Sequence, residues 1–275
     1  MEKAKNILIL GGYGRTGVEL ARLLLKESGH NIGLAGRDQI KAIRSARELN
    51  WEYPGQRVEA VQVNVAFRRK LTGIMTDYDL AVASVRRTAF GGQMAMAALD
   101  ASVNYVDLNP DNDRRKAIEG LHEEVRRAGL TFLTQAGFVP GARELMARYA
   151  AGYFDFPEDA VVRKFDSPSN ERHTRIALTG LKAGRMQTLG MTIEHRDPDL
   201  ATAITALPSI LGLLDGSLKE VGVHAMGHVM DPDRALESLW DRNMMVSLEG
   251  LWDLDQEDSQ PEDIGFMEQV AGNVI

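Results

Sequence analysis

Cysteine is absent from this chain of 275 residues. Without a thiol there is no disulfide bond, no thiolate metal ligand and no cysteine nucleophile. The absence also excludes the dehydrogenases that form a thioester intermediate with their substrate, because that chemistry needs a cysteine.

Long apolar runs and an excess of positive charge are also missing. No segment approaches the roughly 20 apolar residues that a helix needs to cross a bilayer, and the first residues show no export signal. The 32 Lys and Arg against 39 Asp and Glu give a formal net charge of -7. Nucleic acids and anionic membranes attract clustered positive charge. We therefore expect a cytoplasmic protein whose partner is a small molecule, with no nucleic acid and no membrane involved.

The first 155 residues alternate apolar and amphipathic segments with short connections. This rhythm is typical of a parallel sheet with helices on both faces. It predicts an α/β fold, a doubly wound Rossmann sheet, with one continuous helix over residues 111–129. The six expected strands lie at residues 6–10, 31–37, 58–65, 78–84, 104–108 and 130–135.

The rhythm changes near residue 160, which predicts a small α+β second domain. The apolar segment at 200–214 predicts a helix with Pro208 inside it, and this helix has two candidate roles: to cover the sheet or to form a dimer face. We expect a Rossmann domain at 1–155, a reduced substrate or dimerisation region at 156–250 that partly returns to it, and a mobile acidic tail at 251–275. Short strands are expected at 160–165, 175–179, 187–194 and 244–248, and a further helix at 233–242.

A glycine motif follows the first expected strand. Residues 11–17 read GGYGRTG and contain G-x-G-x-x-G at Gly12, Gly14 and Gly17. Gly12 permits a tight turn, Gly14 lets the backbone approach a pyrophosphate, and Gly17 lets the following helix press against the sheet. Amides of the first helical turn would then face the phosphates. The residues expected to contact the cofactor here include Tyr13, Arg15 and Thr16. The strand–turn–helix context predicts a dinucleotide site.

The end of the second strand distinguishes the two nicotinamide cofactors. An acidic residue there would bind the ribose 2′-hydroxyl and repel a 2′-phosphate. The sequence instead has Gly36, which leaves space, followed by Arg37, whose planar guanidinium suits a phosphate. Arg15 adds a second positive charge. Asp38, one position later, keeps NAD as the alternative, but we expect NADP.

Residues at the carboxyl ends of later strands should border the same ligand. For cofactor binding these are Asn64 and Val65, Ser84 and Val85, and Gly137 in the loop after the sixth strand. Arg86 and Asp107 carry charge where a substrate would arrive, which makes them the candidate catalytic residues. A solvent-exposed arginine and a helix-capping aspartate are the alternative interpretations.

Other catalytic patterns receive less support. No tyrosine has a lysine four residues later, so the short-chain dehydrogenase mechanism is disfavoured. His224 and His228 have the i, i+4 spacing of helical metal ligands, but Gly222 and Gly227 disfavour a helix, and we expect no metal. His195, next to Glu194, is a weaker candidate for a general acid or base.

Four segments give the chain a family resemblance: GGYGRTG at 11–17, AGR at 35–37, YVDLN at 105–109 and QAGFVPG at 135–141. With them the chain resembles the saccharopine dehydrogenase (saccharopine reductase-like) superfamily. The resemblance implies hydride transfer between NAD(P) and a carbon–nitrogen bond, and a second domain that often dimerises, hence a homodimer. The chain departs from the family in having only about forty residues between 160 and 200, fewer than an independent domain has. Asn109-Pro110-Asp111 also replaces the family's tyrosine-containing loop.

The sequence thus predicts an NADP-dependent oxidoreductase acting on the imine or amine of a small amino-acid-like substrate. Arg86 would hold a substrate carboxylate, and Asp107 would orient the reacting nitrogen or exchange a proton with it. The alternative is a dinucleotide-binding regulatory or assembly protein without catalysis, which the reduced second domain favours.

Overall fold

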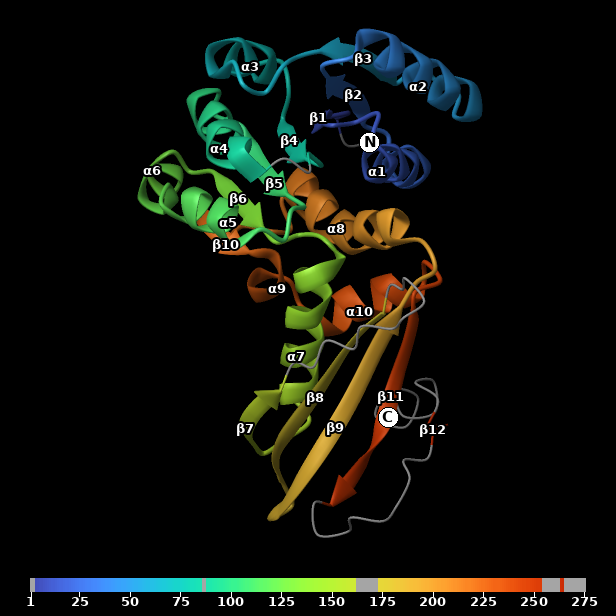
Figure 1. The fold of residues 1–275 in the computed structure, drawn as a ribbon, viewed down its shortest axis with the longest axis vertical. Helices are drawn as coiled ribbons and strands as arrows, with labels where there is room; N and C mark the ends of the chain where they lie inside the picture. The colour runs from blue at the N-terminus through green and yellow to red at the C-terminus, as the bar shows by residue number, and fades with distance from the viewer. Residues whose placement is uncertain (1–2, 86–87, 162–172, 254–262, 265–275) are drawn as a thin grey trace.

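The computed structural model describes residues 3–85, 88–161, 173–253 and 263–264. These residues form two sheets, one above the other in Figure 1. The larger has seven strands in the order β10-β6-β5-β4-β1-β2-β3, all in parallel pairs. The smaller has five strands in the order β12-β11-β9-β8-β7, all in antiparallel pairs.

The larger sheet is built around β1, which pairs with β2 on one side and β4 on the other. Strand order reverses at β1, and in such sheets ligands bind outside the carboxyl ends of the strands at the reversal. The apolar side chains of β1 are fully buried on both faces, as its continuous apolar sequence predicts. The strands are β1 (Asn6–Leu10), β2 (Asn31–Gly36), β3 (Val58–Gln62), β4 (Leu80–Ala83), β5 (Asn104–Asp107), β6 (Thr131–Thr134) and β10 (Gly222–Ala225).

Helices cover both faces of this sheet, which confirms the predicted doubly wound α/β class. On one face α1 (Arg15–Glu27), α2 (Gln39–Glu52) and α8 (Pro198–Asp215) share a core with alternate residues of β1 and β2. The other face carries α3 (Arg68–Met75), α4 (Gly91–Asp100), α5 (Asn112–Glu119) and α6 (His122–Arg127).

The structure corrects the sequence prediction for this part of the molecule in three respects. It has a seventh strand, β10, which pairs with β6 although nearly ninety residues separate them. The helix expected over residues 111–129 is two helices, α5 and α6, because the chain breaks at Gly120 and Leu121. The strand bounds at β2 to β6 are shorter than predicted by one to three residues at their ends.

The smaller sheet packs against helices α7 (Arg143–Ala151) and α10 (Pro232–Trp240) through a separate apolar core. Its two central strands are ten residues each, longer than the short strands predicted. They are joined by Ala183 and Gly184, both with positive φ (52° and 76°), the backbone that a two-residue hairpin turn requires. The strands are β7 (Phe156–Val161), β8 (His173–Lys182), β9 (Arg185–Glu194), β11 (Met245–Asp253) and β12 (Asp263–Ile264).

Helix α8 connects the two parts of the molecule and lies between them in Figure 1. Four of its residues are fully buried in the core of the seven-stranded sheet: Ala203, Ala206, Leu207 and Ile210. Of the two roles that the sequence left open, the helix therefore takes the first and covers the sheet.

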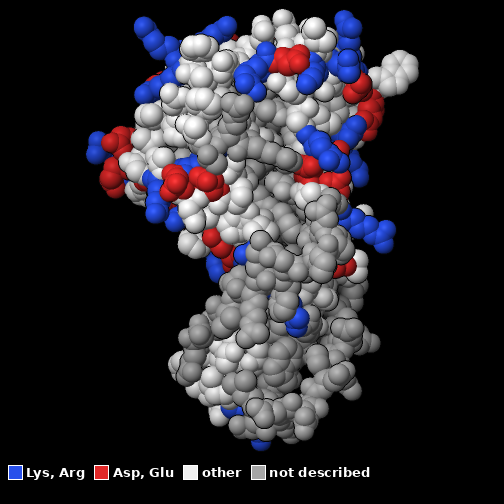
Figure 2. Space-filling model, in the orientation of Figure 1, with Lys and Arg blue, Asp and Glu red and all other residues white. Residues whose placement is uncertain are grey.

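The predicted domain limits stay predictions, and most of the expected acidic tail lies outside the described residues. The structure differs from the expected tail at two places within residues 251–275, since β11 continues to Asp253 and β12 begins at Asp263. Acidic and basic side chains are interspersed over the upper part of the face shown in Figure 2. Within the described ranges, no helix has both the length and the apolarity to span a bilayer.

Candidate functional site: a dinucleotide cleft and its neighbouring cavity

A cleft of about 630 Å³ lies at the carboxyl ends of β1, β2, β3 and β4. This volume is in the range of small-molecule and cofactor sites. Nine of the predicted cofactor residues line it, together with six that the prediction did not include. The nine are Tyr13, Gly14, Arg15, Thr16, Arg37, Asn64, Val65, Ser84 and Val85, and the six are Gly11, Gly36, Val63, Ala66, Phe90 and Asp199.

The N-terminus of α1 opens into this cleft without a capping side chain. Gly14 is its N-cap, with extended backbone (φ -72°, ψ 165°), and the first turn contains no acidic residue. In contrast, α2, α5, α8 and α10 each begin with an aspartate whose side chain accepts a backbone N–H. First-turn amides without partners, at the positive end of a helix dipole, form a binding site for an anion such as a phosphate.

The glycines of the motif allow the backbone to pack closely. A Cβ atom at Gly12 would lie 2.8 Å from the Leu34 Cα, and one at Gly17 would lie 2.7 Å from the Gly11 carbonyl oxygen. Both contacts are too short for a side chain, so Gly12 and Gly17 press α1 against β1 and β2 rather than line the cleft. Gly14 has a Cβ position 3.0 Å from the Gly11 carbonyl oxygen, and it does line the cleft.

Tyr13 occupies the space that the sequence suggested was left open at Gly36. A Cβ atom at Gly36 would lie 2.1 Å from Cε1 of Tyr13, so the ring lies directly against the strand end. The Tyr13 hydroxyl accepts a hydrogen bond from the Asp38 amide at 3.2 Å. The Asp38 carboxylate caps α2 by accepting from the Lys41 amide, and it also pairs with the Lys41 ammonium at 3.7 Å. Asp38 is thus engaged by its own helix, while Arg37 lines the cleft.

Asp199 is the unexpected member of the cleft. It lies in the first turn of α8, 183 residues from Thr16, whose hydroxyl donates to its Oδ1 at 2.5 Å. Its Oδ2 lies 3.5 Å from Arg15 Nε, and its side chain is 8% exposed against 81% for Arg15. Asp199 therefore places a shielded negative charge beside the turn that would receive phosphates.

A second cavity, of about 210 Å³, adjoins the first and shares Thr16, Ser84, Val85 and Asp199 with it. Its remaining lining comes from the ends of β4 and β5 and from α8. Asp199 is the one ionisable side chain among the described residues that line this cavity. The lining residues are Thr16, Ala83, Ser84, Val85, Leu108, Asn109, Pro110, Pro198, Asp199 and Thr202.

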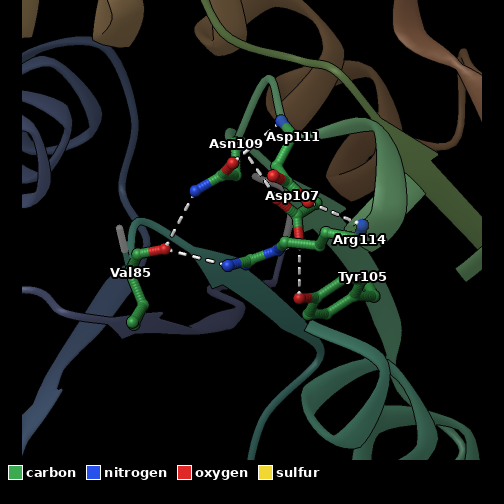
Figure 3. A network of polar contacts seen from close by, with 6 residues as sticks. All are labelled: Val85, Tyr105, Asp107, Asn109, Asp111 and Arg114. Atoms are coloured by element: carbon green, nitrogen blue, oxygen red, sulfur yellow. Dashed lines mark hydrogen bonds and ion pairs between the residues drawn. The ribbon is translucent and has the colours of Figure 1, made fainter. Parts of the chain in front are cut away.

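Asp107 has a different place from the one predicted, since it lines neither cavity. Its side chain is 2% exposed and forms a buried ion pair with Arg114, with Oδ2 2.6 Å from both Nε and Nη2 (Figure 3). The Tyr105 hydroxyl donates to Oδ2 at 2.9 Å, and the Asn109 amide donates to Oδ1 at 2.8 Å. Burial raises the pKa of the Asp107 carboxyl, whereas Arg114, the Asn109 amide and the Tyr105 hydroxyl lower it. Burial likewise raises the pKa of Tyr105, which therefore stays a donor.

The ion pair also fixes the end of β4. Arg114 Nη1 donates to the Val85 carbonyl oxygen at 2.9 Å, and Asn109 Nδ2 approaches the same oxygen at 3.3 Å. Figure 3 shows both groups converging on Val85 from the segment that follows β5. Asp111 is the aspartate that caps α5, by accepting from the Arg114 amide. Asp107 thus positions Val85 through Arg114, and Val85 lines both cavities. Asp107 itself lines neither cavity, so this geometry does not support the catalytic role predicted for it.

The remaining predicted site residues fall elsewhere. Arg86 lies outside the described residues, so its role stays a prediction. Gly137 packs against β5, with a Cβ position 2.5 Å from the Leu108 carbonyl oxygen and 3.3 Å from Thr202, and lines neither cavity. His195 Nδ1 contacts the backbone of Asp197 at the start of α8.

The two histidines with metal-like spacing lie on different elements. His224 is on β10, and His228 is on α9 (Met226–Val229), a short helix that the sequence did not predict. The described residues contain no group of three or more His, Asp or Glu arranged to hold a metal ion. Both histidines do line one further cavity.

The chain's relationship to known proteins agrees with this geometry. Residues 7–133 match the family model described as the saccharopine dehydrogenase NADP binding domain. The match confirms, for this part of the chain, the resemblance drawn from the sequence motifs.

Two solved structures share the fold. Saccharopine dehydrogenase (L-Glu forming) from Saccharomyces cerevisiae, in its apo form, is 15% identical with a TM-score of 0.50, over 80% of this chain and 54% of that chain. The chain thus spans about half the length of that enzyme. An engineered D-amino acid dehydrogenase bound to NADP+ is 12% identical with a TM-score of 0.56, over 88% of this chain and all (100%) of the other.

We predict that the buried pair contributes to stability far more than an exposed pair does. Asp107→Ala should lower the free energy of unfolding by about 3–5 kcal/mol, because it leaves the Arg114 charge buried without its partner. Asp100→Ala removes the exposed ion pair with Arg68. It should lower the free energy of unfolding by about 0–1 kcal/mol. Urea unfolding followed by circular dichroism measures both. Equal losses in the two variants would contradict the structural role of Asp107.

We further predict that Asp199→Asn tightens NADPH binding by about three- to tenfold. The amide keeps an oxygen for the Thr16 hydroxyl but removes a negative charge from beside the phosphate-binding turn. Asp215→Asn, at the exposed opposite end of the same helix, is the matched control and should leave affinity unchanged. Fluorescence titration supplies both dissociation constants, and weaker binding by Asp199→Asn would be inconsistent with a repulsive charge.

Proposed function

We propose that the cleft binds NADP(H) and that the protein is an oxidoreductase acting on the carbon–nitrogen bond of a small amino-acid-like substrate. The observation that carries the proposal is the uncapped N-terminus of α1 in a cleft that Arg37 and Arg15 also line. Backbone amides and guanidinium groups are the donors that proteins use for pyrophosphate and phosphate. The match of residues 7–133 to an NADP binding domain family supports the same cofactor.

The preference for NADP over NAD follows from the end of β2. Arg37 offers a charge-assisted, planar donor to a 2′-phosphate. Asp38, the residue that favoured NAD in the sequence, has its carboxylate held by the Lys41 amide and ammonium. With that carboxylate engaged, Arg37 dominates the charge at the strand end.

The smaller cavity is where we place the substrate. A bound nicotinamide would give a hydride to the carbon of an imine, while the nitrogen gains a proton, and the reverse reaction would oxidise an amine. Asp199 lies at the junction of the two cavities, so its carboxylate is the group that would orient the substrate nitrogen. Asp199 thereby takes the role that the sequence suggested for Asp107. Arg86, next to Val85 in sequence, is retained as the candidate partner of a substrate carboxylate.

The competing proposal is a dinucleotide-binding regulatory or assembly protein without catalysis. One observation favours it: the Asp107 carboxylate is committed to a buried ion pair. The two proposals differ in whether NADPH is consumed when 2-oxo acids are supplied with ammonium, followed by absorbance at 340 nm. Turnover that falls in Asp199→Asn while NADPH affinity holds or rises supports the oxidoreductase. NADPH binding without turnover on any 2-oxo acid supports the regulatory protein.

The homodimer implied by the family resemblance stays a prediction. Light scattering on the purified chain gives its mass in solution, for comparison with 30.3 kDa for one copy.

For the cofactor we predict a large and selective effect of Arg37. Arg37→Ala should weaken NADPH binding by about 10- to 100-fold, the loss expected for hydrogen bonds between charged groups, and should leave NADH binding nearly unchanged. Arg47→Ala, which removes an exposed arginine further along α2, should change neither. Titration of intrinsic fluorescence with each cofactor measures the four dissociation constants. A parallel loss for NADH, or no loss for NADPH, would refute the assignment of Arg37.

A further inference from the structure

A polar cavity of about 430 Å³ lies apart from the cleft described above. Its walls come from α5, the end of β6, the start of α7, β10 and α9. It shares no lining residue with either of the other two cavities. Its polar lining includes Arg115, Glu119, Gln135, Glu144, His224 and His228.

The carboxylate of Glu144 lies in the wall of this cavity, where it is partly buried. A Cβ atom at Gly227 would lie 2.6 Å from Glu144 Oε2, so the carboxylate fits only because glycine stands opposite. Oε2 is buried and has no hydrogen-bond partner among the described residues. Burial raises the pKa of Glu144, and the charges of His228 and Arg115 and the Gly227 amide lower it. A partly desolvated carboxylate with one oxygen that lacks a hydrogen-bond partner gains free energy from any cation that reaches it.

The guanidinium of Arg115, which also lines the cavity, is paired with another carboxylate and not with Glu144. Arg115 forms an ion pair with Glu119 one turn away on α5, with Nη1 2.5 Å from Oε1. The guanidinium is therefore already balanced by a carboxylate. Among the Arg and Glu side chains that line the cavity, Glu144 is the carboxylate that Arg115 does not pair with. The cavity thus favours a monocation over an anion or a zwitterion.

The rest of the lining supplies uncharged polar groups. Gln135 follows β6 and has a φ of +55°, a left-handed conformation that a non-glycine residue adopts at a cost of about 1 kcal/mol or more. The loop that follows packs against its backbone, since a Cβ atom at Gly141 would lie 2.6 Å from the Gln135 carbonyl oxygen. Gln135 lines the cavity with His224 and His228. His224 has its Nε2 near the Val221 carbonyl oxygen at 3.0 Å and its ring edge-on to His122. Amide and imidazole groups suit a ligand hydroxyl, which donates and accepts hydrogen bonds.

We propose that this cavity is a second small-molecule site, which binds a small primary amine carrying a hydroxyl group. The ligand ammonium pairs with the Glu144 carboxylate, and the hydroxyl contacts the amide and imidazole side chains. This site shares no lining residue with the dinucleotide cleft, so ligand binding at each can be measured separately.

The experiment uses the whole chain and two probes, ethanolamine and 3-amino-1-propanol. Their counterparts, ethylene glycol and 1,3-propanediol, have the same carbon skeletons with a hydroxyl in place of the ammonium. Ligand-observed NMR titration gives the dissociation constants. The amines should bind at least tenfold more tightly than the diols. Equal binding of amine and diol, or no amine binding at 100 mM, would overturn the proposal without any variant.

Glu144→Gln tests the carboxylate itself, because it keeps the shape of the side chain and removes its charge. It should weaken amine binding at least tenfold. Glu123→Gln, at an exposed position on α6, should leave it unchanged. An amine affinity in Glu144→Gln equal to that of the unsubstituted chain would refute the site. NADPH titration of the same variant reports on the dinucleotide cleft separately, so failure of one site is distinguishable from failure of the other.

Discussion

The carboxyl edge of the seven-stranded sheet depends on one buried ion pair, between Asp107 and Arg114. It joins the end of β5 to α5, and through Arg114 Nη1 it also holds the carbonyl group of Val85 beyond β4. The stem of Arg114 fits against Gly91 at the start of α4, where a Cβ atom would lie 2.1 Å from the Arg114 Cγ. Two helices and two strand ends are thus fixed relative to one another by an ion pair that is almost inaccessible to water. Both cavities at this edge use Val85, so their shape depends on the same pair.

The second constraint is long-range and comes from α8. This helix leaves the five-stranded sheet and packs on α1, and its first turn brings Asp199 to Thr16 and Arg15. The dinucleotide turn is therefore completed by a residue from the distant part of the chain. Asp199, in the first turn of α8, thus forms part of the cleft wall on that side. The carboxylate of Asp199 would oppose the charge of a bound phosphate, and it also lines the cavity that we propose for the substrate. An oxidoreductase can use such a group if its benefit to the reacting nitrogen exceeds its effect on cofactor affinity.

The parts of this structure that the sequence predicts are those with local signals. The glycine motif, the buried strand before it and the amphipathic helix after it are contiguous, and nine of the predicted cofactor residues line one cleft. The pairing of β10 has no such signal, since its four residues are too few to show a period, and its partner β6 is about ninety residues away. Asp107 shows the limit of reasoning from position. Its strand end is as expected, but Arg114 returns to it only because α5 turns back over the sheet. Asp199 was missed for the same reason, because Asp197 and Pro198 indicate a helix start without indicating what that start contacts.

The central claim is that NADP(H) binds where the uncapped α1 N-terminus, Arg37 and the β3 end meet. Hydrogen–deuterium exchange of the backbone, with and without saturating NADPH, tests it most directly. We expect slower exchange on NADPH addition in residues 11–17, 36–38 and 63–66. Exchange in residues 222–229, beside the polar cavity of about 430 Å³, should stay unchanged. Exchange in residues 11–17 that stays the same while other segments become protected would contradict the account and place the cofactor elsewhere.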